Sequence, residues 1–197
     1  MTAFGVMVVF LFAFALETNR VRLAPVFPGI LWMAFLFAGI IGLGRTYAHE
    51  VPEDALTGLA LAPGDRMAIF LAKLTTALLF MLSMEIVTTP LFFAFFSEPW
   101  DGQWILFGMT LVLGALGIVE LGVLLSAISA NLRSAEIIFT LLLFPLEIPV
   151  LITTVEASTA ILSKPMADPW LWLHGLMAYD VIFFALPLLL YEYLWEV

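Results

Sequence analysis

The sequence has no cysteine, few basic residues and few charged residues of any kind. Among 197 residues there are 7 Lys or Arg and 16 Asp or Glu, so the formal net charge at pH 7 is −9. The absence of cysteine excludes structural disulfides and thiolate metal sites. The shortage of Lys and Arg excludes nucleic acid as a partner, because no basic patch is present to replace phosphate counterions.

Motifs for nucleotide binding and catalysis are also absent. The sequence has no G-x-x-x-x-G-K-[ST], so it lacks the loop that cradles phosphates and cannot hydrolyse ATP by that route. It has no H-E-x-x-H and no G-x-S-x-G, and its only histidines, His49 and His174, are far apart in the sequence. We predict that the chain is not an enzyme and binds no metal or cofactor of its own.

Long apolar stretches dominate what is present. Hydrophobic residues make up 63 % of the chain and charged residues 12 %, against about 25 % in ordinary soluble proteins, and the mean hydropathy is +1.12. The stretches are continuous rather than alternating, which indicates membrane helices and not a barrel. We predict an all-α membrane protein, a single transmembrane domain over 1–197 with six transmembrane helices. Their expected ranges are 1–16, 29–44, 67–97, 104–130, 136–162 and 173–195.

The first stretch is shorter than a membrane span requires. Its roughly 16 apolar residues would form a helix of about 24 Å, against a hydrocarbon core of about 30 Å. It has no basic segment and no small-residue cleavage site, so it does not resemble a signal peptide. We expect that this span lacks its beginning.

The distribution of Lys, Arg and aromatic residues favours one orientation. Basic residues concentrate in short cytoplasmic loops, so we expect the 45–66 loop and the 131–135 turn to face the cytoplasm. The basic residues then divide into Arg45, Arg66, Lys73 and Arg133 inside and Arg20, Arg22 and Lys164 outside. The expected aromatic belts are Trp32, Trp100, Trp104, Trp170 and Trp172 outside, and Tyr47, Tyr191, Tyr193 and Trp195 inside.

Small residues and prolines indicate how the helices pack. Small residues spaced four apart let helices approach closely, and two such sets occur: Ala34, Ala38 and Gly42, then Gly122, Ser126 and Ala130. Four prolines interrupt the backbone hydrogen bonds inside the spans: Pro90, Pro145, Pro149 and Pro187. They predict either tolerated kinks or hinges with carbonyls that line a cavity.

The charged loop RTYAHEVPEDALTGLALAPGDR, residues 45–66, has the pattern of a short helix. Pro52 suits a first helical turn, and Glu53 and Asp54 stand where a helix N-terminus favours negative charge. Leu56, Leu59 and Ala60 then form a small apolar stripe, which Pro63 and Gly64 terminate. Such a helix either lies on the membrane surface or inserts its leucines into a groove of a cytoplasmic partner, and its acidic character favours the partner.

Several longer segments, in this order and spacing, resemble the CcmB family. They are PGILWMAFLFAGIIGLGRTYAHE, LTGLALAPGDRMAIFLAKL, EIVTTPLF and FPLEIPVLI, and the resemblance extends from about Phe4 to the C-terminus. That family is the permease subunit of the haem exporter of cytochrome c maturation and is similar to the wider group of ABC-2-type permeases. The resemblance implies a multi-pass protein of the bacterial inner membrane that takes part in haem export or haem delivery.

The resemblance also implies partners and a coupling site. In that family the loop between the second and third helices carries a coupling helix that docks on a separate, CcmA-type ATPase subunit, which binds the ATP. The corresponding residues here are Glu50, Glu53, Leu56, Leu59, Leu61, Asp65 and Arg66. A homodimer of permeases, CcmC- and CcmD-type subunits and a haem chaperone are further implied partners, with haem as the transported or handled ligand.

The chain departs from the family pattern at two points. Family members usually begin with a charged, amphipathic cytoplasmic segment, whereas Met1 here already lies in apolar sequence. We therefore expect an earlier start. Glu147, between Pro145 and Pro149, stands where the resemblance implies an apolar residue.

Three glutamates are expected near the middle of spans: Glu85, Glu120 and Glu147. An ionised carboxylate at that depth costs at least about 2 to 3 kcal/mol, so these side chains should face the bundle interior or water. They fit a polar translocation path, a proton relay, or hydrogen bonds between helices made by protonated carboxyls. Asp180 and Glu136 are expected closer to helix ends, where a charge needs no special explanation.

Two other functions fit the sequence. A proton-coupled secondary transporter would use the three glutamates and would need no ATPase. A membrane scaffold for an assembly complex would depend on neither ATP nor protonation. His174, close to Trp170 and Trp172, fits either an axial ligand of haem iron or an interfacial side chain in contact with water.

Overall fold

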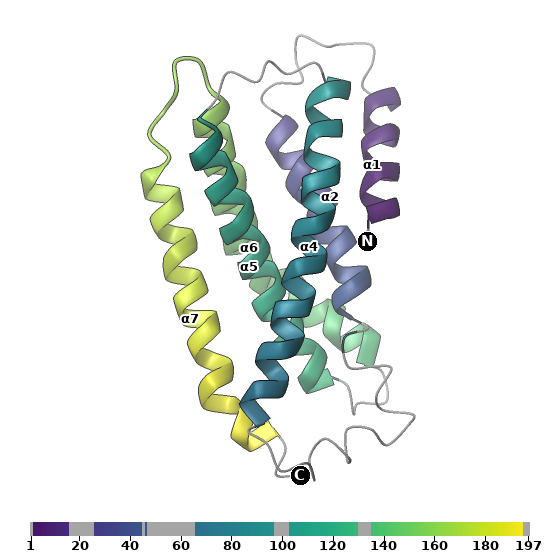
Figure 1. Ribbon diagram of the computed structural model, residues 1–197, viewed down its shortest axis with the longest axis vertical. Helices are drawn as coiled ribbons and strands as arrows, with labels where there is room; N and C mark the ends of the chain where they lie inside the picture. The colour runs from purple at the N-terminus through teal and green to yellow at the C-terminus, as the bar shows by residue number, and fades with distance from the viewer. Residues whose placement is uncertain are drawn as a thin grey trace.

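The computed structural model describes residues 2–15, 26–44, 46, 66–96, 103–129 and 135–194. In this part of the chain every regular element is an α-helix, which confirms the predicted all-α fold (Figure 1). The helices are α1 (Thr2–Ala15), α2 (Phe27–Leu43), α4 (Arg66–Phe96), α5 (Trp104–Ser129), α6 (Ala135–Leu162) and α7 (Trp170–Leu194).

Each of these helices coincides with one of the predicted apolar stretches. Four of them, α4, α5, α6 and α7, are long and apolar enough to cross a membrane. Helices α1 and α2 have 14 and 17 residues and fall short of the roughly 20 that a span requires. The protein is therefore a multi-pass membrane protein, and the full number of six spans stays a prediction for the two shorter helices.

Helix α5 occupies the centre of the bundle. It packs against α2, α4, α6 and α7 and is the most buried of the four long helices. Successive helices run in opposite directions (Figure 1). The end of α2, the start of α4, the end of α5 and the start of α6 therefore lie at one end of the bundle, as alternating spans require.

Helix α1 lies against one half of α4 (Figure 1). A Cβ added at Gly5 would meet the side chains of Thr88 and Met84. Further along both helices, the rings of Phe10 and Phe95 make an edge contact with centroids 4.9 Å apart. The two helices are therefore parallel, with α1 beside the C-terminal half of α4.

Local sequence sets where two of the helices begin. Pro28 lies in the first turn of α2, where the missing N–H of proline costs nothing. At the start of α7 the Asp168 Oδ1 accepts a hydrogen bond from the backbone N–H of Trp170 at 3.0 Å. The backbone N–H groups of Trp172 and Leu173 then both donate to the carbonyl oxygen of Pro169. Helix α7 therefore begins three residues before the predicted 173, because Asp168 caps it.

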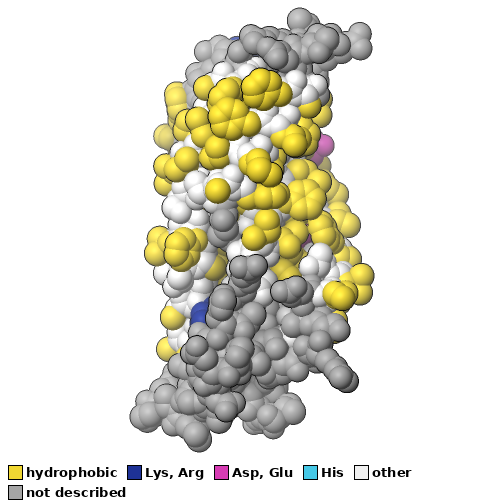
Figure 2. All heavy atoms as spheres, turned by 90° about the vertical axis from the view of Figure 1, so that its right-hand side faces the viewer, with side chains coloured by type: hydrophobic (Ala, Val, Ile, Leu, Met, Phe, Trp, Pro, Cys, Tyr) yellow, Lys and Arg dark blue, Asp and Glu magenta, His cyan; other side chains and the backbone are white. Residues whose placement is uncertain are grey.

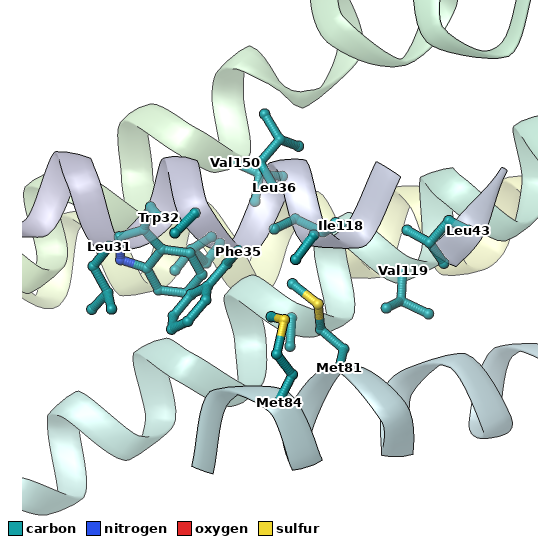
Figure 3. Close-up of a cluster of buried hydrophobic side chains, with 14 of the residues drawn as sticks. Leu31, Trp32, Phe35, Leu36, Leu43, Met81, Met84, Ile118, Val119 and Val150 are labelled. Atoms are coloured by element: carbon teal, nitrogen blue, oxygen red, sulfur yellow. The ribbon is translucent and has the colours of Figure 1, made fainter. Parts of the chain in front are cut away.

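Large apolar side chains from α2, α4, α5 and α6 fill the core (Figure 3). Trp32 and Phe35 of α2 lie edge to face, with ring centroids 5.5 Å apart, and Met81 and Met84 of α4 extend toward them in Figure 3. Toward the end where α2 begins, the rings of α2 and α4 form a second aromatic group: Phe27, Phe92, Phe93 and Phe96. The core therefore consists mainly of rings and methionines packed between helices.

The surface between the helix ends is apolar, as a lipid-facing surface must be. Hydrophobic side chains cover most of the described part of the face drawn in Figure 2, with few acidic or basic side chains among them. Strongly exposed examples are Phe14, Ile86, Ile105 and Leu189. In water so large an apolar surface would aggregate, whereas hydrocarbon accommodates it.

The predicted belt position of Trp32 is wrong. Its side chain is 0 % exposed, and its indole Nε1 donates a hydrogen bond to Ser158 Oγ at 2.9 Å. The indole is buried because Gly114 of α5 lies opposite it and leaves room for the ring, which therefore packs inward instead of outward. Trp104 and Trp170 are exposed, as expected for residues at a membrane interface.

The predicted prolines lie inside helices, and hydroxyl groups bond to carbonyls near them. Pro90 lies in α4, Pro145 and Pro149 in α6, and Pro187 in α7. In α6 the Thr153 hydroxyl donates to the carbonyl oxygen of Pro149 at 2.7 Å. Such bonds to a residue four earlier in the chain are a common companion of bent helices.

Candidate functional site

The predicted coupling loop lies outside the described residues, except for its flanks. Outside the described part lie Glu50, Glu53, Leu56, Leu59, Leu61, Asp65 and the side chain of Arg66. The flank that follows α2 is held by two backbone hydrogen bonds, from Gly44 N to Ile40 O and from Thr46 N to Leu43 O. Lys73 Nζ of α4 then donates to the carbonyl oxygen of Thr46 at 3.1 Å. This bond joins α4 to the chain segment that leaves α2.

Helix α2 is held against α5 and α6 by its tryptophan. Gly114 of α5 lies directly under the Trp32 ring, and a Cβ there would come within 2.5 Å of Trp32 Cζ3 and 2.7 Å of Thr154 Cγ2. The hydrogen bond from Trp32 to Ser158 adds a polar contact with α6. Three helices therefore meet at this ring, and the glycine makes the close approach possible.

The C-terminal end of α2 also packs closely against α5 and α6 through glycines. A Cβ at Gly122 of α5 would come within 2.5 Å of Leu43 Cδ1, and one at Gly44 would meet the Phe139 ring of α6. Of the two predicted small-residue sets, Ala34, Ala38, Gly122 and Ser126 are buried and Gly42 is half-buried. Ala130 lies outside the described part of the chain. Helix α2 therefore packs along its whole length on small residues, including Gly114, which the predicted sets omitted.

The three predicted mid-span glutamates are all buried, and two of them share one region. Glu120 of α5 and Glu147 of α6 are 1 % and 0 % exposed, and both interact electrostatically with Tyr179 of α7. Glu85 of α4 is also buried. It lies next to Met84, whose side chain reaches Gly5 of α1.

The prediction that Asp180 lies near a helix end is wrong. Helix α7 extends from Trp170 to Leu194, so Asp180 lies well inside it, and its side chain is only 5 % exposed. It interacts electrostatically with Glu120. The capping pattern of Asp168 and Pro169 was the available signal, since it moves the start of the helix toward the N-terminus.

Tyr179 connects this acidic region with the proline-containing part of α6. Its hydroxyl donates to the carbonyl oxygen of Leu146 at 3.1 Å, and its ring stacks on Phe183 with centroids 4.2 Å apart. Leu146 lies between Pro145 and Glu147. Helix α7 is therefore fixed to α6 at the segment that the two prolines interrupt.

His174 lies at the surface near the start of α7. Its imidazole is exposed and lies beside the exposed Trp170 ring, with centroids 5.8 Å apart and the planes at 34°. Within the described residues, no three His, Cys, Asp or Glu side chains have an arrangement that would hold a metal ion. The position of His174 fits an interfacial side chain, and the role of haem ligand stays a prediction.

A bundle of apolar helices with a lipid-like surface and an acidic interior defines a polytopic α-helical membrane protein. The family is established by comparison of the sequence. The chain belongs to the CcmB protein family, whose profile matches residues 1–189.

Curated relatives share this assignment. The chain is 28 % identical over 176 residues to "Heme exporter protein B" of Pseudomonas aeruginosa, covering 89 % of this chain and 78 % of the relative. It is 30 % identical over 159 residues to the protein of that name from Rhodobacter capsulatus, covering 78 % and 70 %. It is 29 % identical over 160 residues to the one from Paracoccus denitrificans, covering 79 % and 71 %. The resemblance that the sequence motifs carry is thereby confirmed.

Proposed function

We propose that the chain is the membrane permease subunit of an ABC transporter that exports or delivers haem for cytochrome c biogenesis. The observation that carries this proposal is the family match over residues 1–189, together with relatives that are each called "Heme exporter protein B". The chain has no phosphate-cradling motif, so a separate ATPase subunit would bind and hydrolyse the ATP. This family membership does not favour the secondary transporter or the non-transporting scaffold.

The complex we propose lies in the bacterial inner membrane. Two copies of this permease would meet two copies of a CcmA-type ATPase, with CcmC- and CcmD-type subunits and a haem chaperone at the outer face. Haem is the transported or handled ligand in this proposal and not a cofactor that the chain holds permanently.

The 45–66 loop would receive the motion of the ATPase. Movement of that loop would reach α4 through the bond from Lys73 to Thr46. It would reach α5 and α6 through the end of α2, because Leu43 lies against Gly122 and Gly44 against Phe139. Since cores are close-packed, a displacement of α2 must be shared by the helices that it touches.

The coupling residues are tested by charge placed on one side of the expected loop helix. Leu56→Asp together with Leu59→Asp should abolish co-purification of the ATPase, because two carboxylates would replace the apolar stripe. The matched control is Thr57→Asp with Gly58→Asp, which adds the same charge on the opposite side of the same helical pattern. The control variant should retain the ATPase.

If the Leu56 and Leu59 variant still co-purifies with the ATPase and supports full ATP hydrolysis in the complex, the loop is not the docking element. If no ATPase accompanies the unaltered chain when it is expressed with its neighbouring genes, the proposal of an ABC permease fails.

Glu85, Glu120 and Glu147 are proposed as the polar residues of the permease interior. They are buried from three different helices, and carboxyls at that depth commonly have functional roles in membrane proteins. Replacement of each by Gln in the intact complex, followed by cytochrome c assembly and ATP hydrolysis, separates a role in the transport cycle from one in helix packing. Loss of assembly in a stably inserted variant with normal ATPase binding would favour the role in the cycle.

A further inference from the structure

Three buried carboxyl groups on three packed helices lie around Tyr179, and we name them the carboxyl cluster: Glu120 of α5, Glu147 of α6 and Asp180 of α7. Glu120 and Asp180 interact electrostatically with each other. Tyr179 interacts with all three carboxyls, so its phenol lies within electrostatic reach of each. All three side chains are at least nine-tenths buried. The cluster therefore concentrates acidic groups where hydrocarbon surrounds the protein.

The described part of the chain provides no hydrogen-bond donor to this cluster. All six carboxyl oxygens of Glu120, Glu147 and Asp180 are buried without a hydrogen-bond partner among the described residues. The neighbouring phenol does not supply one, because the Tyr179 hydroxyl donates its single proton to the Leu146 carbonyl. Its oxygen retains capacity to accept. The cluster thus has hydrogen-bond acceptors, but it lacks the donor protons that would pair with them.

The packing around Asp180 decides which ligand fits. Gly117 of α5 faces the Asp180 carboxylate, and a Cβ there would come within 3.1 Å of Asp180 Oδ1 and 3.1 Å of Val150 Cγ2. Not even a methyl group fits on this side without movement of its neighbours. On this side of Asp180 there is no room for a metal ion with its ligands or for an organic cation, whereas a proton needs none.

Charged groups on the surrounding helices do not neutralise the cluster. Helix α2 has no titratable side chain, and Glu120 is the only one on α5. On α4, Glu85 is itself acidic, and Lys73 binds the Thr46 carbonyl at the bundle end where α2 finishes. The side chain of Arg66, at the start of α4, lies outside the described part of the chain. On α6 and α7 the remaining groups with described side chains, Glu156 and His174, are exposed. Ionised Glu120 and Asp180 would therefore repel each other at membrane depth, and an ionised Glu147 would be buried there without a counter-charge among the described residues.

We propose that the carboxyl cluster is a proton-binding site inside the α5, α6 and α7 bundle. Bound protons supply the missing donors, so that neutral carboxyls hydrogen-bond to one another and to the Tyr179 oxygen and hold the three helices together. Release of the protons leaves like charges on α5, α6 and α7 and loosens their packing. The site goes beyond the proposed function, because it requires neither haem nor ATP.

The experiment is infrared spectroscopy of the purified full chain in lipid nanodiscs. A neutral carboxylic acid has a carbonyl stretching band that an ionised carboxylate lacks. Since Glu85 is also buried, all variants are made in a Glu85→Gln background, so that the band reports the cluster. At neutral pH the band should be present. Glu120→Gln, Glu147→Gln and Asp180→Asn should each remove one carboxyl's share of it, and the exposed Glu156→Gln should leave it unchanged.

A pH titration with the same samples tests reversible binding. The band should disappear reversibly as the pH is raised, and thermal stability should fall with it. A variant with Glu120→Gln, Glu147→Gln and Asp180→Asn together should lose this fall. The proposal is overturned if the band is absent at neutral pH, or if it persists until the chain unfolds. Neither measurement uses haem or the ATPase, so failure here leaves the proposed function intact, and the reverse also holds.

Discussion

Gly114→Ala should disturb the packing of α2 on α5 more than its single methyl group suggests. The new Cβ would approach the Trp32 ring at Cη2 and Cζ3 and the Thr154 methyl group, the last at 2.7 Å. The ring cannot move aside easily, because it is fully buried and its Nε1 is bonded to Ser158. The helix or the indole must therefore shift.

The magnitude is set by two opposing effects. Replacing glycine by alanine inside a helix stabilises the folded state by about 0.5 to 1 kcal/mol, and overpacking a close-packed core costs about 1 to 3 kcal/mol. Gly108→Ala is the matched control on α5, since a Cβ at Gly108 meets nothing within 4 Å. The control should gain only the stabilisation that comes from replacing glycine by alanine inside a helix. The two variants should therefore differ by about 1 to 3 kcal/mol, or about 5- to 150-fold in the unfolding equilibrium.

The assay is reversible unfolding of the purified chain in mixed detergent micelles, followed by far-ultraviolet circular dichroism. A double variant identifies the clash: Trp32→Leu should cost less in the Gly114→Ala background than in the unaltered chain, with a coupling of at least about 0.5 kcal/mol. Equal stability of Gly114→Ala and Gly108→Ala, or strict additivity in the double variant, would refute the packing of Trp32 on Gly114.

Three further predictions concern buried polar contacts. Ser158→Ala leaves the buried Trp32 Nε1 without an acceptor and should destabilise the chain by about 0.6 to 1.7 kcal/mol in the same unfolding assay. Tyr179→Phe removes the bond to the Leu146 carbonyl and the oxygen that accepts from the carboxyl cluster but retains an aromatic ring, and it should cost at least about 0.6 kcal/mol in that assay. Glu85→Gln keeps the size and hydrogen-bonding capacity of the side chain, so cells with this variant should assemble cytochrome c at nearly the normal level. A stably inserted Glu85→Gln variant that fails in assembly would point to a translocation path or a proton relay.

Several features follow from the order of residues alone. Continuous apolar stretches predicted the six helices, because lipid leaves no unpaired backbone group and so forces each stretch into helix. Errors were confined to their ends, as at α7, where capping by Asp168 moved the start to Trp170. The family was also readable from the sequence, since a few segments in a fixed order carry it, and the match over residues 1–189 confirms it.

The neighbours of each helix could not be read in this way. Periodicity shows which side chains share a face of one helix, and it contains no information about which helix lies opposite. Trp32 was expected at the membrane interface, and it is buried because Gly114, far away in the sequence, makes room for its ring.

The same limit applies to the acidic residues. Each glutamate was correctly expected in a span, yet only the packing of α5, α6 and α7 brings Glu120 and Glu147 to Tyr179 and adds Asp180 beside Gly117. The sequence by itself determined that carboxyl groups lie at membrane depth, because the helical segments are fixed by their length and hydrophobicity. Tertiary structure decided which of these carboxyls meet, because that depends on contacts between helices that are distant along the chain.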